Sequence, residues 1–241
     1  MTALGEWYEE AFRADYLRVY PHRDDAAAAA EVADLAGRVP GLGAGRRVLD
    51  LGCGAGRHLR ALRAAGARPV GADLSPDLLA EARRRGARCL IRCDTRALPF
   101  RDGAFDAVAS FFTSFGYFGP GAGDAEALGE AARVLAAGGG LVLDLPDADA
   151  VRGGLVPRSE RAEGRASILE ERRLLDGGRR VEKRVTVRED GRERSWTESV
   201  RLYGPGEVEA MAAGAGLRPL DRLSSLGGAP RWVLVLRKGA P

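Results

Sequence analysis

Three glycines, Gly52, Gly54 and Gly56, follow the apolar run 48–51 and precede a segment of helical character. The run is short and flanked by glycine, which predicts a buried strand of a parallel sheet. Glycines keep side chains away from the backbone N–H groups, and a helix N-terminus attracts an anionic group such as a carboxylate. The pattern therefore predicts a cofactor-binding turn between a strand and a helix.

The spacing of these glycines argues against a dinucleotide site. If Gly52 and Gly54 begin a G-x-G-x-x-G fingerprint, its third glycine position is occupied by Arg57. Asp50, two residues before Gly52, repels a pyrophosphate but pairs favourably with an ammonium group. We therefore expect a ligand that carries an amine and a carboxylate together.

These residues resemble motif I of the class I S-adenosylmethionine-dependent methyltransferases, and further landmarks follow in that family's order. A second strand is predicted to end at Asp73, before a helix that opens at Ser75, and a third (87–92) ends before Asp94. Segments 98–108 and 132–140 resemble the family's approaches to its fourth and fifth strands. The resemblance implies a doubly wound α/β fold, Rossmann-like, with a mostly parallel seven-stranded sheet and an antiparallel last strand.

The resemblance also implies a cofactor, S-adenosyl-L-methionine, and a set of residues that contact it. Asp73 is expected to accept both ribose hydroxyls, and Asp94 to lie at the adenine edge. The residues expected to bind the cofactor are Asp50, Gly52, Cys53, Gly54, Gly56, Asp73, Leu74, Asp94, Thr95 and Phe111.

Several of these residues also have a purely structural interpretation. Asp73 and Asp94 follow strands, where aspartate commonly caps the next helix. Asp106 precedes an apolar strand and is explained as the end of a glycine-rich turn, so we assign it no catalytic role. His58 falls in the first turns of the helix after the glycines and is expected to support that helix.

Length and charge limit the classes of function. The 241 residues suffice for one large α/β domain with an inserted subdomain. The formal net charge of +3 is too small for electrostatic binding of nucleic acid by the protein as a whole. Only Lys183 and Lys238 are lysines, and the many arginines are spread among acids instead of forming a stripe. We therefore expect no nucleic-acid partner.

The cysteine pattern favours a reducing compartment. Cys53, Cys89 and Cys93 form no C-x-x-C pair and have no histidine at metal spacing, which argues against structural zinc and predicts no metal site. Cys89 and Cys93 are expected to pack around the third strand. The sequence contains neither a membrane-length apolar run nor a secretion signal, so we expect a cytoplasmic protein without a membrane partner.

Residues 1–45 are predicted to form two helices ahead of the sheet. An aromatic stripe between Trp7 and Tyr20 recurs at roughly helical spacing, and Asp24 suits the start of the second helix. The stripe is explained either as core packing or as a lid over cofactor and substrate. The resemblance favours the lid, because many small-molecule methyltransferases place an N-terminal helical segment there.

The core is expected to comprise residues 46–150 and 204–241, with an insertion at 151–203. Three strands are predicted in the insertion, separated by turns at Asp-Gly pairs, and they form an antiparallel meander; they span residues 166–175, 179–188 and 194–203. Dense charges of both signs predict one solvated face. The meander either walls the substrate pocket or pairs with a second subunit in a homodimer, and the sequence leaves both open.

Residues 111–119 follow the fourth strand and are expected to line the acceptor side. They are aromatic and hydroxyl-bearing, and they lack the Pro-Pro-aromatic motif of relatives that methylate base amines or glutamine amides. This composition favours a small organic acceptor, although the phenylalanines are also explained as core. If the acceptor arrives protonated, His22 and Tyr117 are candidate catalytic bases.

Three functions remain open at this point. The leading one is transfer of a methyl group in line from S-adenosylmethionine to a small organic acceptor, for which positioning matters more than a protein nucleophile. The second is a nucleic-acid or protein methyltransferase, weakened by the absent Pro-Pro motif. The third is a binding protein that has kept the cofactor pocket and lost methyl transfer.

Overall fold

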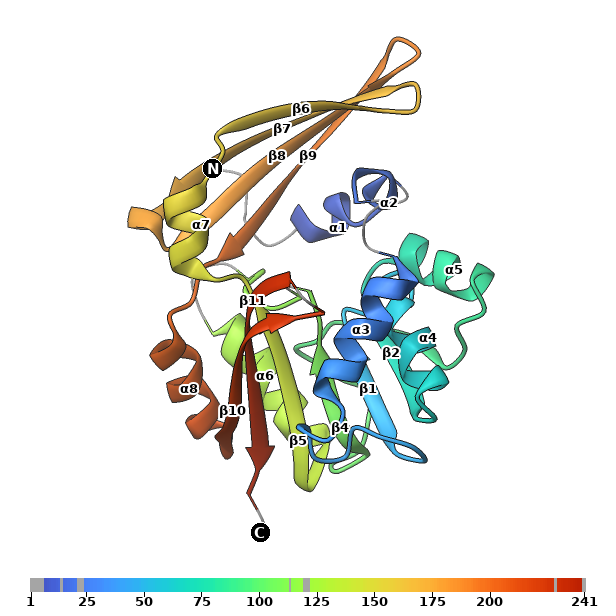
Figure 1. The fold of residues 1–241 in the computed structure, drawn as a ribbon, viewed down its shortest axis with the longest axis vertical. Helices are drawn as coiled ribbons and strands as arrows, with labels where there is room; N and C mark the ends of the chain where they lie inside the picture. The colour runs from blue at the N-terminus through green and yellow to red at the C-terminus, as the bar shows by residue number, and fades with distance from the viewer. Residues whose placement is uncertain are drawn as a thin grey trace.

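Two separate sheets organise the chain, as the computed structural model in Figure 1 shows for residues 7–13, 15–20, 24–112, 114–118, 122–227 and 229–239. The seven-stranded sheet contains β1 (Arg47–Leu51), β2 (Arg68–Asp73), β3 (Leu90–Arg92), β4 (Phe105–Ser110), β5 (Leu135–Leu145), β10 (Leu217–Leu226) and β11 (Ala229–Lys238). The four-stranded sheet contains β6 (Arg158–Glu163), β7 (Ala166–Leu175), β8 (Arg180–Glu189) and β9 (Arg192–Arg201).

The helices precede, connect and cover these sheets. They are α1 (Trp7–Ala11), α2 (Tyr16–Val19), α3 (Asp25–Leu35), α4 (Arg57–Ala64), α5 (Pro76–Arg84), α6 (Gly123–Val134), α7 (Ala148–Gly154) and α8 (Pro205–Gly214). No helix in the described ranges is long and apolar enough to span a bilayer.

The larger sheet has the predicted number of strands and the predicted directions. Its strands run β3-β2-β1-β4-β5-β11-β10, with parallel pairing from β3 to β5 and antiparallel pairing of β11 with β5 and β10. Parallel strands need crossover connections, which α4, α5 and α6 supply. The predicted doubly wound fold with an antiparallel last strand is confirmed.

Apolar side chains cover both faces of this sheet, as expected for parallel strands under helices on both sides. On one face Leu35 of α3 and Leu62 of α4 pack against β1, β4 and β11. On the other face Leu128 of α6 and Val208 of α8 pack against β4, β5 and β11. Leu141 on β5 is fully buried in this second cluster. The core therefore fixes the sheet whose carboxyl edge carries the site.

The third strand is shorter than predicted. The sequence indicated residues 87–92, but β3 comprises only Leu90–Arg92. Cys89 has a positive φ of 57° and is exposed, so the expectation that it packs around this strand is wrong. A left-handed residue interrupts the extended backbone, which explains why pairing with β2 begins only after it.

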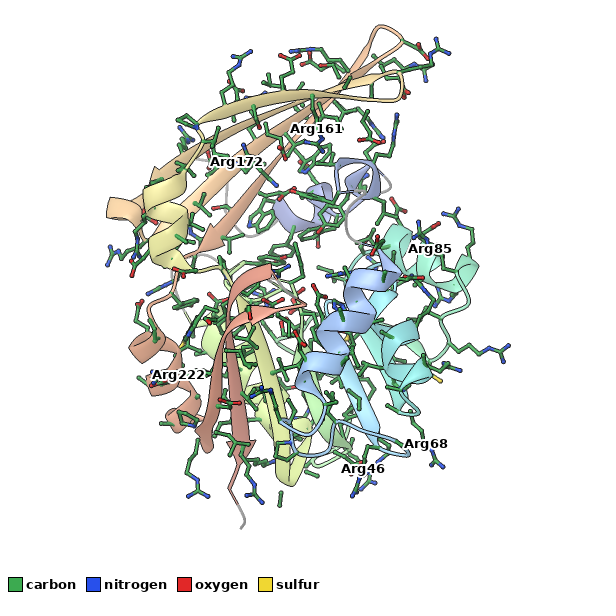
Figure 2. The ribbon with its side chains drawn as sticks, in the orientation of Figure 1. Arg46, Arg68, Arg85, Arg161, Arg172 and Arg222 are labelled. Carbon is green, nitrogen blue, oxygen red and sulfur yellow. The ribbon has the colours of Figure 1, made fainter. Side chains whose placement is uncertain are left out.

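The second sheet has one strand more than predicted. Its last three strands match the predicted meander closely, but β6 precedes them and pairs antiparallel with β7. Most residues of β6 are charged and Ala162 is its only apolar residue, so the sequence shows no apolar alternation there. The exposed side of the sheet carries Glu171, Arg184 and Arg188, as the predicted solvated face requires. Figure 2 shows labelled arginines on several sides of the molecule, which agrees with the absence of a basic stripe.

Residues 7–13 and 15–20, which we call the N-terminal segment, lie between the two sheets (Figure 1). Its aromatic stripe forms two short helices, α1 and α2, instead of one helix. Ala11 and Val19 pack against Ile168, Val185 and Trp196 on the inner face of the four-stranded sheet. The second predicted helix is α3, which Asp24 caps by accepting the N–H of Ala27 at 2.8 Å.

We expect Leu141→Ala to lower the free energy of unfolding by about 2–5 kcal/mol, because it leaves a cavity between β5 and the helices α6 and α8. Leu220→Ala is the matched control, since Leu220 is 49% exposed on β10. Urea unfolding followed by circular dichroism measures both. Equal losses in the two variants would contradict this account of the core.

Candidate functional site

A cavity of about 390 Å³ lies at the carboxyl edge of the parallel strands. Its walls come from the loops after β1, β2, β3 and β4, together with the N-terminal segment. Ligands of open α/β sheets bind at this edge, and the volume lies within the usual range of about 300–1,000 Å³ for small-molecule sites. We refer to it as the cofactor cavity.

The glycine loop after β1 lines this cavity, and its backbone conformation favours glycine at both Gly52 and Gly54. Gly52 has a φ of 67°, and a Cβ atom added to it would lie 2.5 Å from the Ser114 hydroxyl oxygen. Gly54 has a φ of 51° and also lines the wall, as does Cys53 between them. Both the backbone conformation and the close approach of Ser114 therefore require glycine here.

Asp73 ties the glycine loop to the loop after β2. One carboxylate oxygen accepts the N–H of Gly54 at 2.8 Å, and the other accepts the N–H of Ser75 at 2.8 Å. Burial raises the pKa of Asp73, and the N–H donors of Ser75 and Gly54 oppose that rise. Asp73 also lines the cavity, so a ligand hydroxyl there would lie beside its carboxylate. Ser75, not Asp73, caps α5.

Asp50 and Gly56 lie below the cavity wall. Asp50 is 1% exposed, and neither of its carboxylate oxygens has a hydrogen-bond partner among the described residues. Burial raises its pKa well above the usual range, against the opposing charge of Arg57. Gly56 begins α4 with a φ of 75° and packs against Ala82 and Ala87. A cationic ligand group near the loop would compensate the buried carboxyl, which fits an ammonium group.

The loop after β3 forms another wall of the cofactor cavity. Asp94 and Thr95 line it, and Asp94 accepts hydrogen bonds from the backbone N–H of Arg96 at 2.8 Å and from its guanidinium at 2.6 Å. Hydrogen bonding to Arg96 lowers the pKa of Asp94. Asp94 therefore closes a local turn and does not cap a helix. Leu74 and Phe111 also line the cavity.

His58 joins a buried ionic cluster beside the cavity. Its Nε2 lies 2.5 Å from Glu31, and its ring stacks on Phe111 at 3.9 Å. Arg57 at 3.2 Å and Arg231 at 3.7 Å also approach Glu31. Burial lowers the pKa of His58 to about 4, so at neutral pH its uncharged ring supports α4 as predicted.

The N-terminal segment covers the cofactor cavity. Tyr8, Phe12 and Tyr16 line it, and the Ser75 hydroxyl donates a hydrogen bond to the Phe12 carbonyl. On its other side Arg18 pairs with Glu189 of the four-stranded sheet at 2.8 Å. The segment thus contacts both sheets, and the aromatic stripe serves packing and cavity wall at once.

A second cavity, of about 720 Å³, lies between the N-terminal segment, the four-stranded sheet and the loops after β4 and β5. Four aromatic residues, Phe12, Tyr16, Phe112 and Tyr117, line both cavities. We call them the aromatic junction. The four-stranded sheet therefore forms one wall of this second cavity.

A buried ion pair holds one member of the aromatic junction. Phe112 has a positive φ of 52°, and its N–H donates to Asp144 at 2.7 Å. Arg231 pairs with Asp144 at 2.9 Å and lies over the Phe112 ring at 4.1 Å. Strands β5 and β11 thereby fix the backbone and ring of Phe112, which sequence analysis did not single out.

The two catalytic candidates have different outcomes. His22 lies outside the described residues. Tyr117 lies in the aromatic junction, where its carbonyl accepts the Trp7 indole N–H at 3.2 Å and its ring lies 5.4 Å from that of Phe12. Within the described ranges no cluster of side chains suited to a metal ion occurs.

The second cavity has charged side chains in its wall that were not predicted from the sequence. Arg172, Lys183 and Glu198 line it from β7, β8 and β9. The signal was present, because Arg172 shares its strand face with the buried Ile168, four residues earlier. Alternation along β7 thus turns the charge of Arg172 inward.

The chain is similar to known methyltransferases. A family model described as a methyltransferase domain matches residues 48–139. The demethylmenaquinone methyltransferase of Thermus thermophilus is 48% identical over 121 residues, which are 47% of this chain and 53% of the relative. The match thus spans about half the length of that protein.

Two solved structures resemble nearly the whole chain. DesVI of Streptomyces venezuelae is 28% identical with a TM-score of 0.72, and the match covers 94% of this chain and 96% of DesVI. The sugar N-methyltransferase KedS8 of Streptoalloteichus is 25% identical with a TM-score of 0.71, covering 99% of this chain and 95% of KedS8. The similarity therefore includes both sheets.

We expect the His58 ring to stay uncharged down to a pH of about 4. Because this pKa lies below the usual 6.5, the unfolded chain binds the proton more readily, and stability falls as the pH drops from 6.5 to about 4. Nuclear magnetic resonance titration of the imidazole measures the pKa. Urea unfolding at pH 7 and pH 5 should show a smaller loss for His58→Gln than for the unsubstituted protein. A His58 pKa above 6.5 would contradict the assignment.

Proposed function

We propose that this chain, which belongs to the class I S-adenosylmethionine-dependent methyltransferases, transfers a methyl group from S-adenosylmethionine to a small organic acceptor. The observation that carries the proposal is the cofactor cavity at the strand edge, with Asp73 joining the loops on its floor. When bound, the cofactor supplies an electrophilic methyl group on a sulfonium, and an acceptor lone pair displaces the sulfur in line.

The cavity residues have distinct proposed roles toward the cofactor. Asp73 accepts the ribose hydroxyls with the lone pairs left after its two backbone contacts. The glycine loop and the N-terminus of α4, where Gly56 provides no side-chain cap, accommodate the carboxylate. Asp50 attracts the ammonium group from beneath the loop, and Asp94 and Thr95 flank the adenine.

We propose that Cys53, Leu74 and Phe111 contact the cofactor and shape its cavity. All three line the cofactor cavity, and Phe111 is held by stacking on His58. These residues would hold the cofactor in place by packing, and good alignment of donor and acceptor lowers a transfer barrier by several kcal/mol. Tyr117 contacts the reacting atoms from the junction, and a protonated acceptor would donate to its hydroxyl.

The second cavity is the proposed acceptor site. It adjoins the cofactor cavity at the aromatic junction, so an acceptor bound there has its reactive atom beside the methyl group. KedS8, similar over nearly its whole length, is a sugar N-methyltransferase by name. We therefore propose amine-bearing small molecules, amino sugars among them, as the first acceptors to test.

We expect Asp73→Ala to weaken binding of S-adenosylhomocysteine by about 1.5–3 kcal/mol, because hydrogen bonds to a charged group are lost. Isothermal titration calorimetry measures the affinity, and circular dichroism confirms that the variant is folded. Asp102→Ala is the control, since its side chain is 81% exposed and pairs only at the surface with Arg133. Unchanged affinity in folded Asp73→Ala would remove this residue from the site.

We expect methyl transfer to small amines but not to oligonucleotides or peptides, because the volume of the acceptor cavity, about 720 Å³, is that of a small-molecule site. Mass spectrometry detects the gain of about 14 Da per methyl group, with the cofactor as the only methyl source. Binding of cofactor without transfer to any member of a broad panel would favour the silent binding protein. Preferential transfer to a macromolecule would refute the proposal.

A further inference from the structure

The inner face of the four-stranded sheet carries a row of charged side chains between apolar ones. Arg172 lies opposite Lys183 in the pairing of β7 with β8, and Lys183 lies opposite Glu198 in the pairing of β8 with β9. The three side chains are only 24%, 16% and 13% exposed. Withdrawing charges from water is costly, so an inward-facing charged row in a cavity wall indicates a function.

The carboxylates in and beside this row already have several donors each. Glu198 accepts from Tyr20 at 2.8 Å, Trp196 at 3.1 Å and Lys183 at 2.9 Å. Glu170, 8% exposed beneath the row, accepts from Arg172 at 2.6 Å and from Arg161 at 3.2 Å. Neither carboxylate depends on a ligand for its hydrogen bonds.

Arg172 and Lys183 have more N–H groups than hydrogen-bond partners among the described residues, and the Lys183 ammonium also lies 4.4 Å from the centre of the Tyr20 ring. Among the described residues, Arg172 donates to the Ser159 hydroxyl at 3.0 Å and to Glu170, which uses two of its five N–H groups. Lys183 donates to Glu198 and lies 3.8 Å from Glu170, beyond hydrogen-bond distance. Both line the second cavity.

The charges of this region do not cancel within the sheet. Arg161, Arg172 and Lys183 surround two carboxylates, Glu170 and Glu198, which leaves one positive charge in excess. Arg231 and Asp147 also line the cavity: Arg231 pairs with Asp144, and Asp147 accepts two backbone N–H groups at the start of α7 and keeps its negative charge, so the positive excess is local to the row. Figure 2 shows Arg161 and Arg172 on the four-stranded sheet, apart from the other labelled arginines.

We propose that Arg172 and Lys183 form an oxyanion-binding subsite, and that the acceptor molecule carries a carboxylate or a phosphoryl group bound there. The inference rests on the proposed function, because it takes the second cavity as the acceptor site. An oxyanion offers only acceptor atoms, which match the remaining N–H donors of both side chains, and it neutralises the excess charge. The anionic group then sets the depth of the acceptor and leaves its nucleophile at the aromatic junction.

Binding of small probes tests the subsite without knowledge of the acceptor. Benzoate, phenyl phosphate and benzyl alcohol share a ring and differ in the charged group; each is titrated calorimetrically into the protein saturated with S-adenosylhomocysteine. We expect at least one anion to bind roughly tenfold more tightly than the alcohol, as charge-assisted hydrogen bonds provide. The preferred anion distinguishes a carboxylate from a phosphoryl group.

Matched variants identify the residues involved. Lys183→Met should abolish the preference for anions, and Lys183→Arg should retain most of it. Arg184→Met is the control, because Arg184 is the next residue on β8 and is exposed on the opposite face, so the loss of net charge is the same. If Lys183→Met does not fold, Arg172→Met replaces it, with Arg173→Met as control.

Three results overturn the subsite. They are equal affinities for the anions and the alcohol, an equal loss in Lys183→Met and Arg184→Met, and full preference in a folded Lys183→Met. Failure of the proposed function is distinguishable, since it shows first as absent binding of S-adenosylhomocysteine in the same titrations.

Discussion

The contact of the Asp73 carboxylate with two backbone N–H groups is the interaction on which the cofactor cavity depends. It joins the glycine loop after β1 to the loop after β2 across neighbouring parallel strands. Burial penalises the carboxylate, and its two backbone donors compensate, so the loops are held where a ligand can share the same oxygens. This contact therefore holds the floor of the cavity in place.

The acceptor side depends on contacts between the two sheets. The N-terminal segment packs its small apolar residues on the four-stranded sheet and places Phe12 and Tyr16 between the cavities. Phe112 is fixed from the opposite side by Asp144 and Arg231. The aromatic junction is thus assembled from the N-terminal segment and the loop after β4, is held from the last strand by Arg231, and lies between the two cavities.

The charged row and the aromatic junction suggest how one cavity selects an acceptor. Aromatic rings provide a low-polarity surface near the methyl group, whereas Arg172 and Lys183 lie on the sheet that walls the other side of the cavity. An acceptor with its nucleophile at one end and an oxyanion at the other spans these features. Under the proposed function, specificity would arise from these two separated contacts, and transfer would require that both are satisfied together.

The sequence alone determined the glycine loop and the succession of core strands along the chain. Both depend on local properties: glycines at positive φ, short apolar runs and a cap at Ser75. The sequence did not determine β6, the exposure of Cys89 or the inward charged row. Only the tertiary structure decided which face of the meander is buried, and it brought Arg231 to Asp144 across 87 residues. Such contacts depend on how the sheets pack, and no local pattern encodes that arrangement.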